Sequence, residues 1–223
     1  MNLLIIGNPD QAEECSQKFG QQHNVMATDN YASIPGTQTP DVIFDFNTPR
    51  QTLENSADVL PPGAFIFFDT SARRLTEIVR HFPLRAGRSF GFCGLKTLVN
   101  RSLLEVSLAD PADRPALETL CNNLGTEFRV VADQAGMVTP RVLCMIINEA
   151  YYTLEEGTAT KEDIDLAMKL GTNYPYGPFE WADRIGLVNV KRVLEAALLD
   201  SHDDRYRVCP LLVRLAEGGE IQS

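Results

Sequence analysis

The stretch Gly171-Thr-Asn-Tyr-Pro-Tyr-Gly-Pro-Phe-Glu-Trp-Ala-Asp-Arg-Ile-Gly-Leu187 decides how the second half of the chain folds. Its glycines and prolines predict turns and helix caps. Pro178 suits the first turn of a helix, where no N–H is needed, and Glu180 would lie near the positive end of that helix dipole. We therefore expect a short helix to begin at Pro178, with the apolar residues Phe179, Trp181 and Leu187 in a core.

The segments before this stretch also have helical spacing. Thr160 predicts an N-cap with Asp163 three residues on, and Gly171 is expected to close that helix as its C′ residue. Ile164, Ala167 and Met168 would form its apolar stripe. A longer helix is expected to end near Gly157, with these residues on one face: Val138, Val142, Met145, Ile146 and Ala150. Strand signals stop after Asp133, so we expect an all-helical domain over residues 133–223.

The first half of the chain has a different pattern. Short β-branched or aromatic runs are separated by amphipathic stretches of helical length, which predicts βαβ units and a largely parallel sheet. The runs at 3–6, 42–46 and 64–68 are apolar nearly throughout, as in strands buried on both faces. The expected fold is an α/β, shortened Rossmann-like, doubly wound domain over residues 1–132. Its expected strands are 3–6, 25–28, 42–46, 64–68, 90–92, 103–107 and 128–131.

Composition limits the partners and the compartment. The formal net charge of -10 and the sequence pI of about 4.8 disfavour nucleic acid and anionic membranes, which attract clustered Lys and Arg. The first apolar run is too short for a signal sequence or a membrane span. The chain has five cysteines, an odd number, and none of them form a Cys-x-x-Cys pair. This pattern is typical of reduced thiols in a cytoplasmic protein.

The helical half resembles the C-terminal domain of the 3-hydroxyacyl-CoA dehydrogenases almost end to end. This family oxidises fatty acyl thioesters with NAD. The matching motifs are Asp133-x-x-Gly136, Arg141, Asn148-Glu149-Ala150, Lys161-Glu-Asp-Ile-Asp-x-Ala-Met-Lys-Leu-Gly171 and the Gly-Pro-Phe-Glu segment. Each motif residue also has a purely structural interpretation, because glycine and proline positions more often fix a backbone than contact a ligand.

The resemblance further implies a homodimer formed through the helical half. The candidate interface anchors are Met137, Tyr151, Tyr152 and Trp181, all of which are equally compatible with a core. The implied substrate is a small acyl-CoA-like molecule.

The first strand of the family leads into Gly-x-Gly-x-x-Gly, which lets the backbone approach a pyrophosphate at a helix N-terminus. Here it leads into Gly7-Asn8-Pro9-Asp10-Gln11-Ala12, and only Gly7 is retained. Pro9 removes an N–H and Asp10 adds a negative charge, whereas Asn8 as N-cap and Pro9 as N1 residue make a sensible helix start. Asp29, about twenty residues further on, stands where an acidic residue would hold the adenosine ribose of NAD. The helical excursion that follows in the family is largely absent between Tyr31 and Pro40.

Two further segments resemble parts of the family's site. Asp69, Thr70 and Ser71 stand where the family has Asn-Thr-Ser, and Thr70 or Ser71 is the expected N-cap of a helix through Ile78 unless it contacts the cofactor. An ungapped alignment of residues 88–106 on the family's Gly-x-His-Phe-Phe-Asn-Pro segment puts Cys93 at the catalytic histidine.

The same alignment puts Glu105 at the carboxylate partner of that histidine. A thiol beside a carboxylate should have a pKa above about 8.5 and be a poor base. Lys96 stands at the family's Asn position, where it would act as acid or base only if desolvated; a solvent-facing lysine is the alternative. Pro140 replaces another Asn that would help to orient the substrate.

No metal site is expected, because His23, His81 and His202 are isolated and predicted to be solvated or capping residues. Three functions remain open at the level of sequence. The first is a diverged NAD-linked dehydrogenase with weakened or altered catalysis, and the second is a non-catalytic pseudoenzyme that binds or dimerises. The third is a changed reaction on a carbonyl or imine substrate that uses Lys96.

Overall fold

A computed structural model of the 223-residue chain describes residues 1–31, 39–47, 63–81 and 88–219. The chain divides into two compact units, Met1–Met137 and Val138–Ser223. The sequence boundary near residue 132 stays a prediction. The segment between Tyr31 and Pro40, where the family has its helical excursion, lies mostly outside the described residues.

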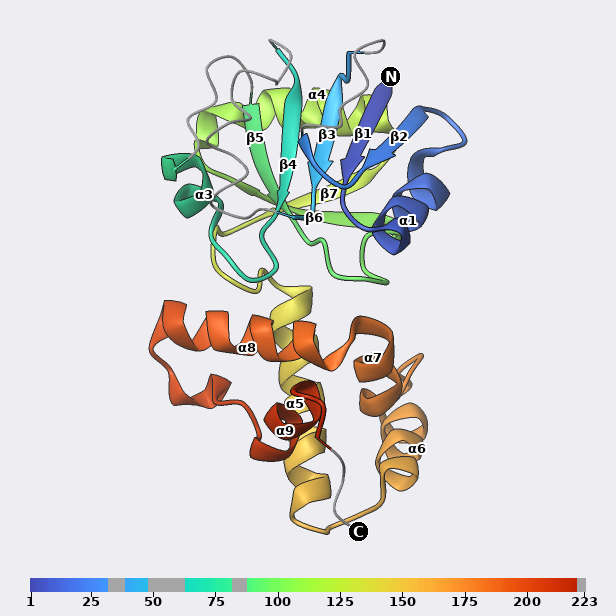
Figure 1. The fold of residues 1–223 in the computed structure, drawn as a ribbon, viewed down its shortest axis with the longest axis vertical. Helices are drawn as coiled ribbons and strands as arrows, with labels where there is room; N and C mark the ends of the chain where they lie inside the picture. Colours follow the sequence, from blue (N-terminus) through green and yellow to red (C-terminus); the bar gives the residue numbers. More distant parts are fainter. Residues whose placement is uncertain (32–38, 48–62, 82–87, 220–223) are drawn as a thin grey trace. The chain divides into compact units, whose positions relative to one another are not determined.

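The first unit is built on a seven-stranded mixed sheet of order β2-β1-β3-β4-β5-β6-β7 (Figure 1). β5 and β6 pair antiparallel because a short connection joins them, and the other neighbouring strands are parallel. The sequence prediction of a shortened Rossmann-like doubly wound domain is confirmed. The strands are β1 (Asn2–Ile6), β2 (Asn24–Thr28), β3 (Val42–Asp45), β4 (Phe65–Asp69), β5 (Arg88–Phe92), β6 (Leu103–Leu108) and β7 (Glu127–Val131).

Helices cover both faces of the sheet, because alternate residues of each strand point to opposite sides. α1 (Pro9–Phe19) and α4 (Arg114–Leu124) pack on one face. α3 (Leu75–His81) packs on the other. β1, β3 and β4 are buried on both faces, as their continuous apolar runs predict. A 3-10 turn, η2 (Pro111–Asp113), precedes α4.

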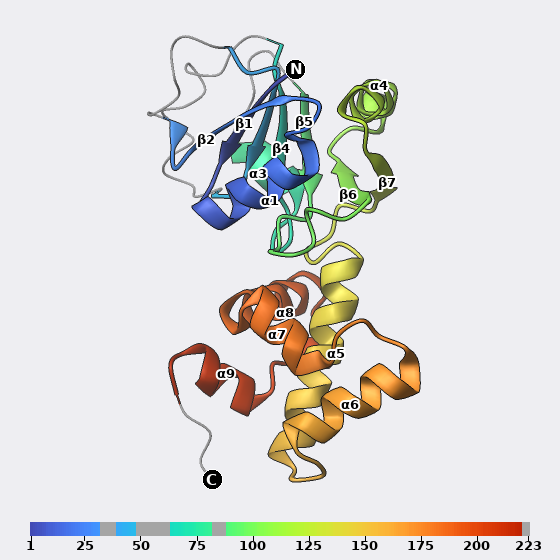
Figure 2. The same ribbon diagram turned by 90° about the vertical axis from the view of Figure 1, so that its right-hand side faces the viewer.

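The described part of the second unit is helical throughout (Figure 2). α5 packs against α7, α8 and α9, and α6 packs against α7. Among the described residues of the chain, no helix is long and apolar enough to cross a membrane. The elements are α5 (Thr139–Glu155), α6 (Lys161–Thr172), α7 (Pro178–Ile185), α8 (Leu187–Ser201), η3 (Asp204–Tyr206) and α9 (Pro210–Ala216).

Two helix predictions for this unit were wrong in detail. α6 does not end at Gly171; it continues to Thr172, and Asn173 takes the left-handed conformation with φ 55°. Asparagine tolerates this region, so it replaces glycine as the helix stop. On α5 the predicted face is buried at Ala150 but exposed at Val138 and Val142, while Ile147, outside that face, is fully buried. Apolar residues occupy most positions of α5, so periodicity did not identify the core face.

Asp165 on α6 determines the fold of the 171–187 stretch. Its buried carboxylate accepts the N–H groups of Phe179 at 2.8 Å and Glu180 at 3.1 Å, and so caps α7 from a different helix. A Cβ at Gly177 would lie 2.2 Å from Asp165 Cγ, so only glycine fits there. Pro178 opens α7, as predicted, and Glu180 accepts the N–H of Gly177 at 2.9 Å.

Two motif residues of the second unit hold its helices to the segment before α9. The Asn148 side chain accepts the N–H of Cys209 at 2.8 Å and donates to the Arg207 carbonyl at 2.9 Å. The Arg141 guanidinium donates to the Tyr206 hydroxyl at 2.8 Å and also lies against its ring. Both residues therefore have structural partners within their own unit, which supports the structural interpretation of these motifs.

The cysteines give this fold a pH dependence. All five are buried free thiols, and burial raises the pKa of Cys144 from 9.0 to about 12. Because the folded state holds this proton more tightly, the stability that Cys144 contributes is full below its unfolded pKa and is lost as the pH rises toward 12. Cys144→Ala should lessen the alkaline loss of unfolding free energy, by a slope that approaches about 1.4 kcal/mol per pH unit once the pH exceeds about 9. Urea unfolding of both proteins between pH 8 and 10 measures the two slopes, and equal slopes would contradict the prediction.

Candidate active site

The carboxyl ends of β1 and β3 form the topological switch point of the sheet. The chain leaves β1 for β2 on one side and returns to β3 on the other, and ligands of open α/β sheets bind where the strand order reverses. Gly7 follows β1 and donates its N–H to the Thr28 carbonyl at 3.0 Å. A Cβ at Gly7 would approach Phe46 Cβ to 3.3 Å, so glycine allows close packing at this point.

Asn8 is the N-cap of α1 and Pro9 its N1 residue, as the sequence predicts, and Gln11 completes a capping box. Asn8 Oδ1 accepts the Gln11 N–H at 3.0 Å, and Gln11 Oε1 accepts the Asn8 N–H at 2.9 Å. Pro9 at N1 has no N–H to offer. The N–H groups of Asn8 and Gln11 therefore donate to side chains of the chain itself. In a dinucleotide-binding loop, N–H groups of this kind donate to the pyrophosphate.

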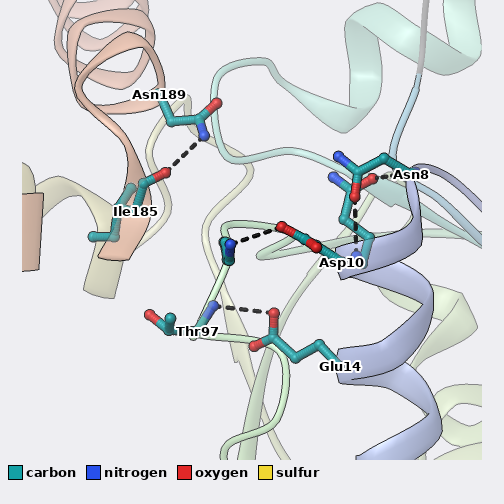
Figure 3. Close-up of polar contacts among 8 residues, drawn as sticks. Asn8, Asp10, Glu14, Thr97, Ile185 and Asn189 are labelled. Atoms are coloured by element: carbon teal, nitrogen blue, oxygen red, sulfur yellow. Dashed lines mark hydrogen bonds and ion pairs between the residues drawn. The ribbon is translucent and has the colours of Figure 1, made fainter. Parts of the chain in front are cut away.

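Asp10 and Lys96 form an ion pair at this helix start, with 2.7 Å between Oδ2 and Nζ (Figure 3). The Lys96 side chain is about half exposed, which agrees with the solvent-facing alternative. Lys96 therefore contacts α1 and is not desolvated in the way that acid or base chemistry by a lysine requires.

Asp29 lies directly after β2 with an exposed side chain, and its carboxylate accepts a hydrogen bond from Asn30 at 2.7 Å. Its carbonyl accepts a second from Asn47 Nδ2 at 2.8 Å, which ties the ends of β2 and β3 together. Beside it, Tyr31 donates to the buried Asp45 carboxylate at 2.7 Å. Burial, followed by the Asp45 charge, raises the pKa of Tyr31 well above its usual value. Asp29 thus remains available to a ribose hydroxyl from solvent.

The expected N-cap role of Thr70 or Ser71 was wrong. α3 begins at Leu75, and its first N–H groups, on Leu75 and Thr76, are accepted by the Asp133 carboxylate at 2.6 and 2.9 Å. Asp133 is 57 and 58 residues away in sequence, so local spacing did not reveal it. Thr70 and Ser71 are buried at the carboxyl end of β4 instead.

Thr70 Oγ1 is 3.2 Å from the carbonyl of Phe92 and 3.4 Å from the sulfur of Met137. Ser71 donates its hydroxyl to Asp69 at 2.5 Å, and Asp69 also accepts the N–H of Gly94 at 3.0 Å. The carboxylate of Asp69 thus binds the Ser71 hydroxyl to the turn that follows β5.

Cys93 lies in the same buried cluster, with its sulfur 3.9 Å from Ser71 Oγ. Its pKa is raised well above the ordinary value, chiefly by burial and further by the negative charges of Asp69 and Glu105, against a lowering effect of the Leu95 backbone hydrogen bond. Cys93 is therefore a protonated thiol at neutral pH. A protonated thiol is a poor proton acceptor, which is the property that the sequence predicts for this position.

Glu105 lies on β6, partly buried, close enough for its charge to act on Cys93. The fold therefore brings Cys93, Glu105, Thr70 and Ser71 to one region of the first unit. Gly7, Asn8 and Lys96 gather at the start of α1, and Asp29 lies at the end of β2. The exposed ion pair of Lys96 with Asp10 does not support acid or base chemistry by this lysine, while the roles expected for the other residues stay predictions.

Two of the four candidate interface anchors, Met137 and Tyr151, are buried within their units, while Tyr152 and Trp181 are partly exposed. Pro140 is buried in the first turn of α5. His202 caps α8 in the left-handed region, and His23 Nε2 lies 3.2 Å from the Leu124 carbonyl. The side chain of His81 lies outside the described part. The described residues contain no cluster of three or more potential His, Cys, Asp or Glu metal ligands.

Sequence reasoning did not reveal that four acidic residues bind other segments of the chain, although three of them lie in the motifs quoted above. Glu14, Asp69, Asp133 and Asp165 all accept backbone N–H groups from other segments. The partners of three of them, Glu14, Asp69 and Asp133, are more than twenty residues away in sequence. The Asp165 partner on α7 is 14 residues away. None of these pairs follows a helical or strand spacing, so no pattern in the sequence identifies them.

Comparison with known proteins agrees with this geometry. Residues 136–223 match the family model of the 3-hydroxyacyl-CoA dehydrogenase C-terminal domain. The chain is 36% identical over 176 residues to the 3-hydroxybutyryl-CoA dehydrogenase of Bradyrhizobium diazoefficiens, covering 76% of this chain and 59% of that protein. It is 36% identical over 165 residues to a probable 3-hydroxybutyryl-CoA dehydrogenase of Bacillus subtilis, covering 72% of this chain and 57% of that one. The matches thus span less than two thirds of these relatives' own length.

A solved structure shares the fold over nearly the whole chain. The (S)-3-hydroxybutyryl-CoA dehydrogenase of Ralstonia eutropha superposes with a TM-score of 0.77 at 22% identity, covering 97% of this chain and 94% of that one. At this identity the likeness establishes the fold alone. The helical domain match, the relatives in sequence and the shared fold point to the same group of proteins. The chain belongs to the 3-hydroxyacyl-CoA dehydrogenase family.

Proposed function

We propose that the chain is an NAD-linked oxidoreductase of acyl-CoA or related hydroxy-acid substrates whose catalysis is weakened. The observation that carries the proposal is the buried, protonated thiol of Cys93 beside Asp69 and Glu105. Oxidation of a 3-hydroxyl requires a group that takes up the hydroxyl proton. Cys93 keeps its own proton at neutral pH, so this chain lacks an efficient acceptor at that position.

The residues at the switch point fit the adenosine ribose of a dinucleotide better than its pyrophosphate. Asp29 is exposed after β2, where a carboxylate accepts ribose hydroxyls. At the pyrophosphate position, the capping box uses the N–H groups of Asn8 and Gln11, and Asp10 adds negative charge. A bound NAD would supply the hydride acceptor. We propose that Asp29 and Gly7 hold it, with an affinity lowered by the start of α1.

The substrate proposal rests on the relatives. The curated relatives are named for 3-hydroxybutyryl-CoA, and a 3-hydroxyadipyl-CoA dehydrogenase of Escherichia coli is 43% identical over 103 residues. We extend the acyl-CoA class, without a chain length, to this protein. Reduced cysteines and the acidic composition support a cytoplasmic location.

The capping box also favours a second function, a non-catalytic pseudoenzyme. If the N–H groups at the start of α1 remain occupied by Asn8 and Gln11, the first unit is a scaffold and the helical unit carries the binding role. Tight NADH or acyl-CoA binding would contradict this alternative.

Calorimetric titration with NADH separates the two functions. We expect wild-type protein to bind NADH in the micromolar range. Asp29→Ala should raise the dissociation constant by about tenfold, as expected for loss of a hydrogen bond to a charged group. Glu77→Ala, an exposed carboxylate on α3, is the matched control and should bind as wild type does. Wild-type protein that binds no NADH up to millimolar concentration would leave the pseudoenzyme function.

We further propose a homodimer formed through the helical unit. Leu166 and Leu170 lie one turn apart on α6 and are 52% and 79% exposed, with Tyr174 following at 36%. Burying such side chains against a second copy removes apolar surface from water. Light scattering should give a dimer mass for wild type and a monomer mass for Leu170→Glu, with unchanged circular dichroism. Glu162→Lys, an exposed charge change on the same helix, is the control, and a dimer of Leu170→Glu would remove this surface from the proposal.

A further inference from the structure

One face of α1 contacts the loop between β5 and β6, which lies between Cys93 and Glu105 in the chain. Lys96 pairs with Asp10 at 2.7 Å, and Asn100 Nδ2 donates to Gln17 at 3.2 Å. Lys18 donates to the carbonyl of Arg101. Positions 10, 14, 17 and 18 lie on one side of a helix, so α1 contacts this loop along most of its length. Figure 3 shows Asp10 and Glu14 of α1 facing this segment.

Glu14 makes the central contact of this face. Its Oε2 accepts the N–H of Thr97 at 3.0 Å, and its Oε1 accepts those of Val99 at 3.0 Å and Asn100 at 3.1 Å. Three N–H groups that converge on one carboxylate form an anion-binding concavity, which here is filled by the chain's own side chain. Glu14 is only 8% exposed, so these three donors compensate for the burial of its polar oxygens.

The same contact stabilises an unusual backbone. Thr97 has φ 70°, a left-handed conformation that side-chain-bearing residues rarely adopt. Such a conformation persists where surrounding contacts hold it. Glu14 supplies one of these contacts directly, through the Thr97 N–H.

The loop in turn defines the surroundings of Cys93. A backbone N–H at Leu95 hydrogen-bonds the Cys93 thiol, and the Gly94 N–H donates to Asp69. A shift of residues 94–100 would therefore move the donors around the sulfur. We infer that Glu14 is a positioning residue. It holds the loop between Cys93 and Glu105 in place, and this loop determines the positions of Cys93 and Lys96. Its relevance to catalysis rests on the proposed function, but its effect on the loop does not.

Amide hydrogen exchange tests the inference without any ligand. In Glu14→Ala, exchange at Thr97, Val99 and Asn100 should rise at least about tenfold, because each N–H loses its acceptor. Glu14→Gln keeps one carbonyl oxygen and should give an intermediate increase. Glu77→Ala removes an exposed carboxylate from α3, away from this loop, and should match wild type. Wild-type exchange at these three amides in Glu14→Ala would overturn the inference.

Cys93 alkylation, followed by peptide mass spectrometry, separates positioning from general loosening. Release of the loop should raise the iodoacetamide reaction rate of Cys93 by about tenfold while Cys121 and Cys144 stay at the wild-type rate. An unchanged Cys93 rate in a protein with faster exchange would overturn the positioning role. If Glu14→Ala unfolds the first unit, the same two readouts in Glu14→Gln decide. Absence of NADH binding by wild type would defeat the proposed function and leave these outcomes unaffected.

Discussion

Replacing Cys93 with histidine is expected to raise the NAD-dependent oxidation of 3-hydroxybutyryl-CoA by about 10²- to 10⁴-fold, the usual contribution of a positioned general base. Imidazole has a pKa near 6.5 and takes up a proton at neutral pH, whereas burial, Asp69 and Glu105 keep the Cys93 thiol protonated. The nearby Glu105 charge that disfavours a thiolate would stabilise an imidazolium. The substitution thus makes the Glu105 charge favourable for the ionised side chain at position 93, whereas it is unfavourable for an ionised thiol.

The measurement is the rate of NADH formation at saturating NAD. Cys93→Gln, similar in size but without a base, is the matched control and should show no gain. Adding Glu105→Ala to Cys93→His should remove most of the gain, because the imidazolium loses its partner. If Cys93→His is no faster than Cys93→Gln while both bind NADH, the proposal that a missing base weakens catalysis is wrong.

Replacing Asp165 with alanine is expected to destabilise the second unit by about 2–4 kcal/mol. The buried carboxylate accepts the N–H groups of Phe179 and Glu180, and its loss leaves two N–H groups of α7 without an acceptor. The effect should exceed that of an ordinary surface substitution, because Asp165 links α6 to α7 and fills the space beside Gly177.

Urea unfolding measures this difference. Glu162→Ala, an exposed carboxylate on the same helix, should change the unfolding free energy by less than about 0.5 kcal/mol. Asp165→Asn keeps one acceptor oxygen and should fall between the two. A loss in Asp165→Ala no larger than that in Glu162→Ala would show that the long-range cap contributes little.

Local chemistry at the start of α1 could be predicted from sequence. Asn8 as N-cap and Pro9 as N1 residue were recognised because a helix start depends on residue types within one turn. Thr160 and Pro178 likewise mark the helix starts correctly. The end of α6 was misplaced because Gly171 and Asn173 are both acceptable helix stops, and the choice depends on the packing of the following turn.

The sequence by itself determined the two-part architecture and the strand and helix pattern, because these depend on residue type and on spacing of a few residues. Only the tertiary structure decided the partners of Glu14, Asp69, Asp133 and Asp165. A buried carboxylate needs several N–H donors, and folding brings those donors from distant segments. The surroundings of Cys93 depend on the same long-range contacts, so the burial and the Asp69 charge that raise its pKa above the ordinary value follow from the fold.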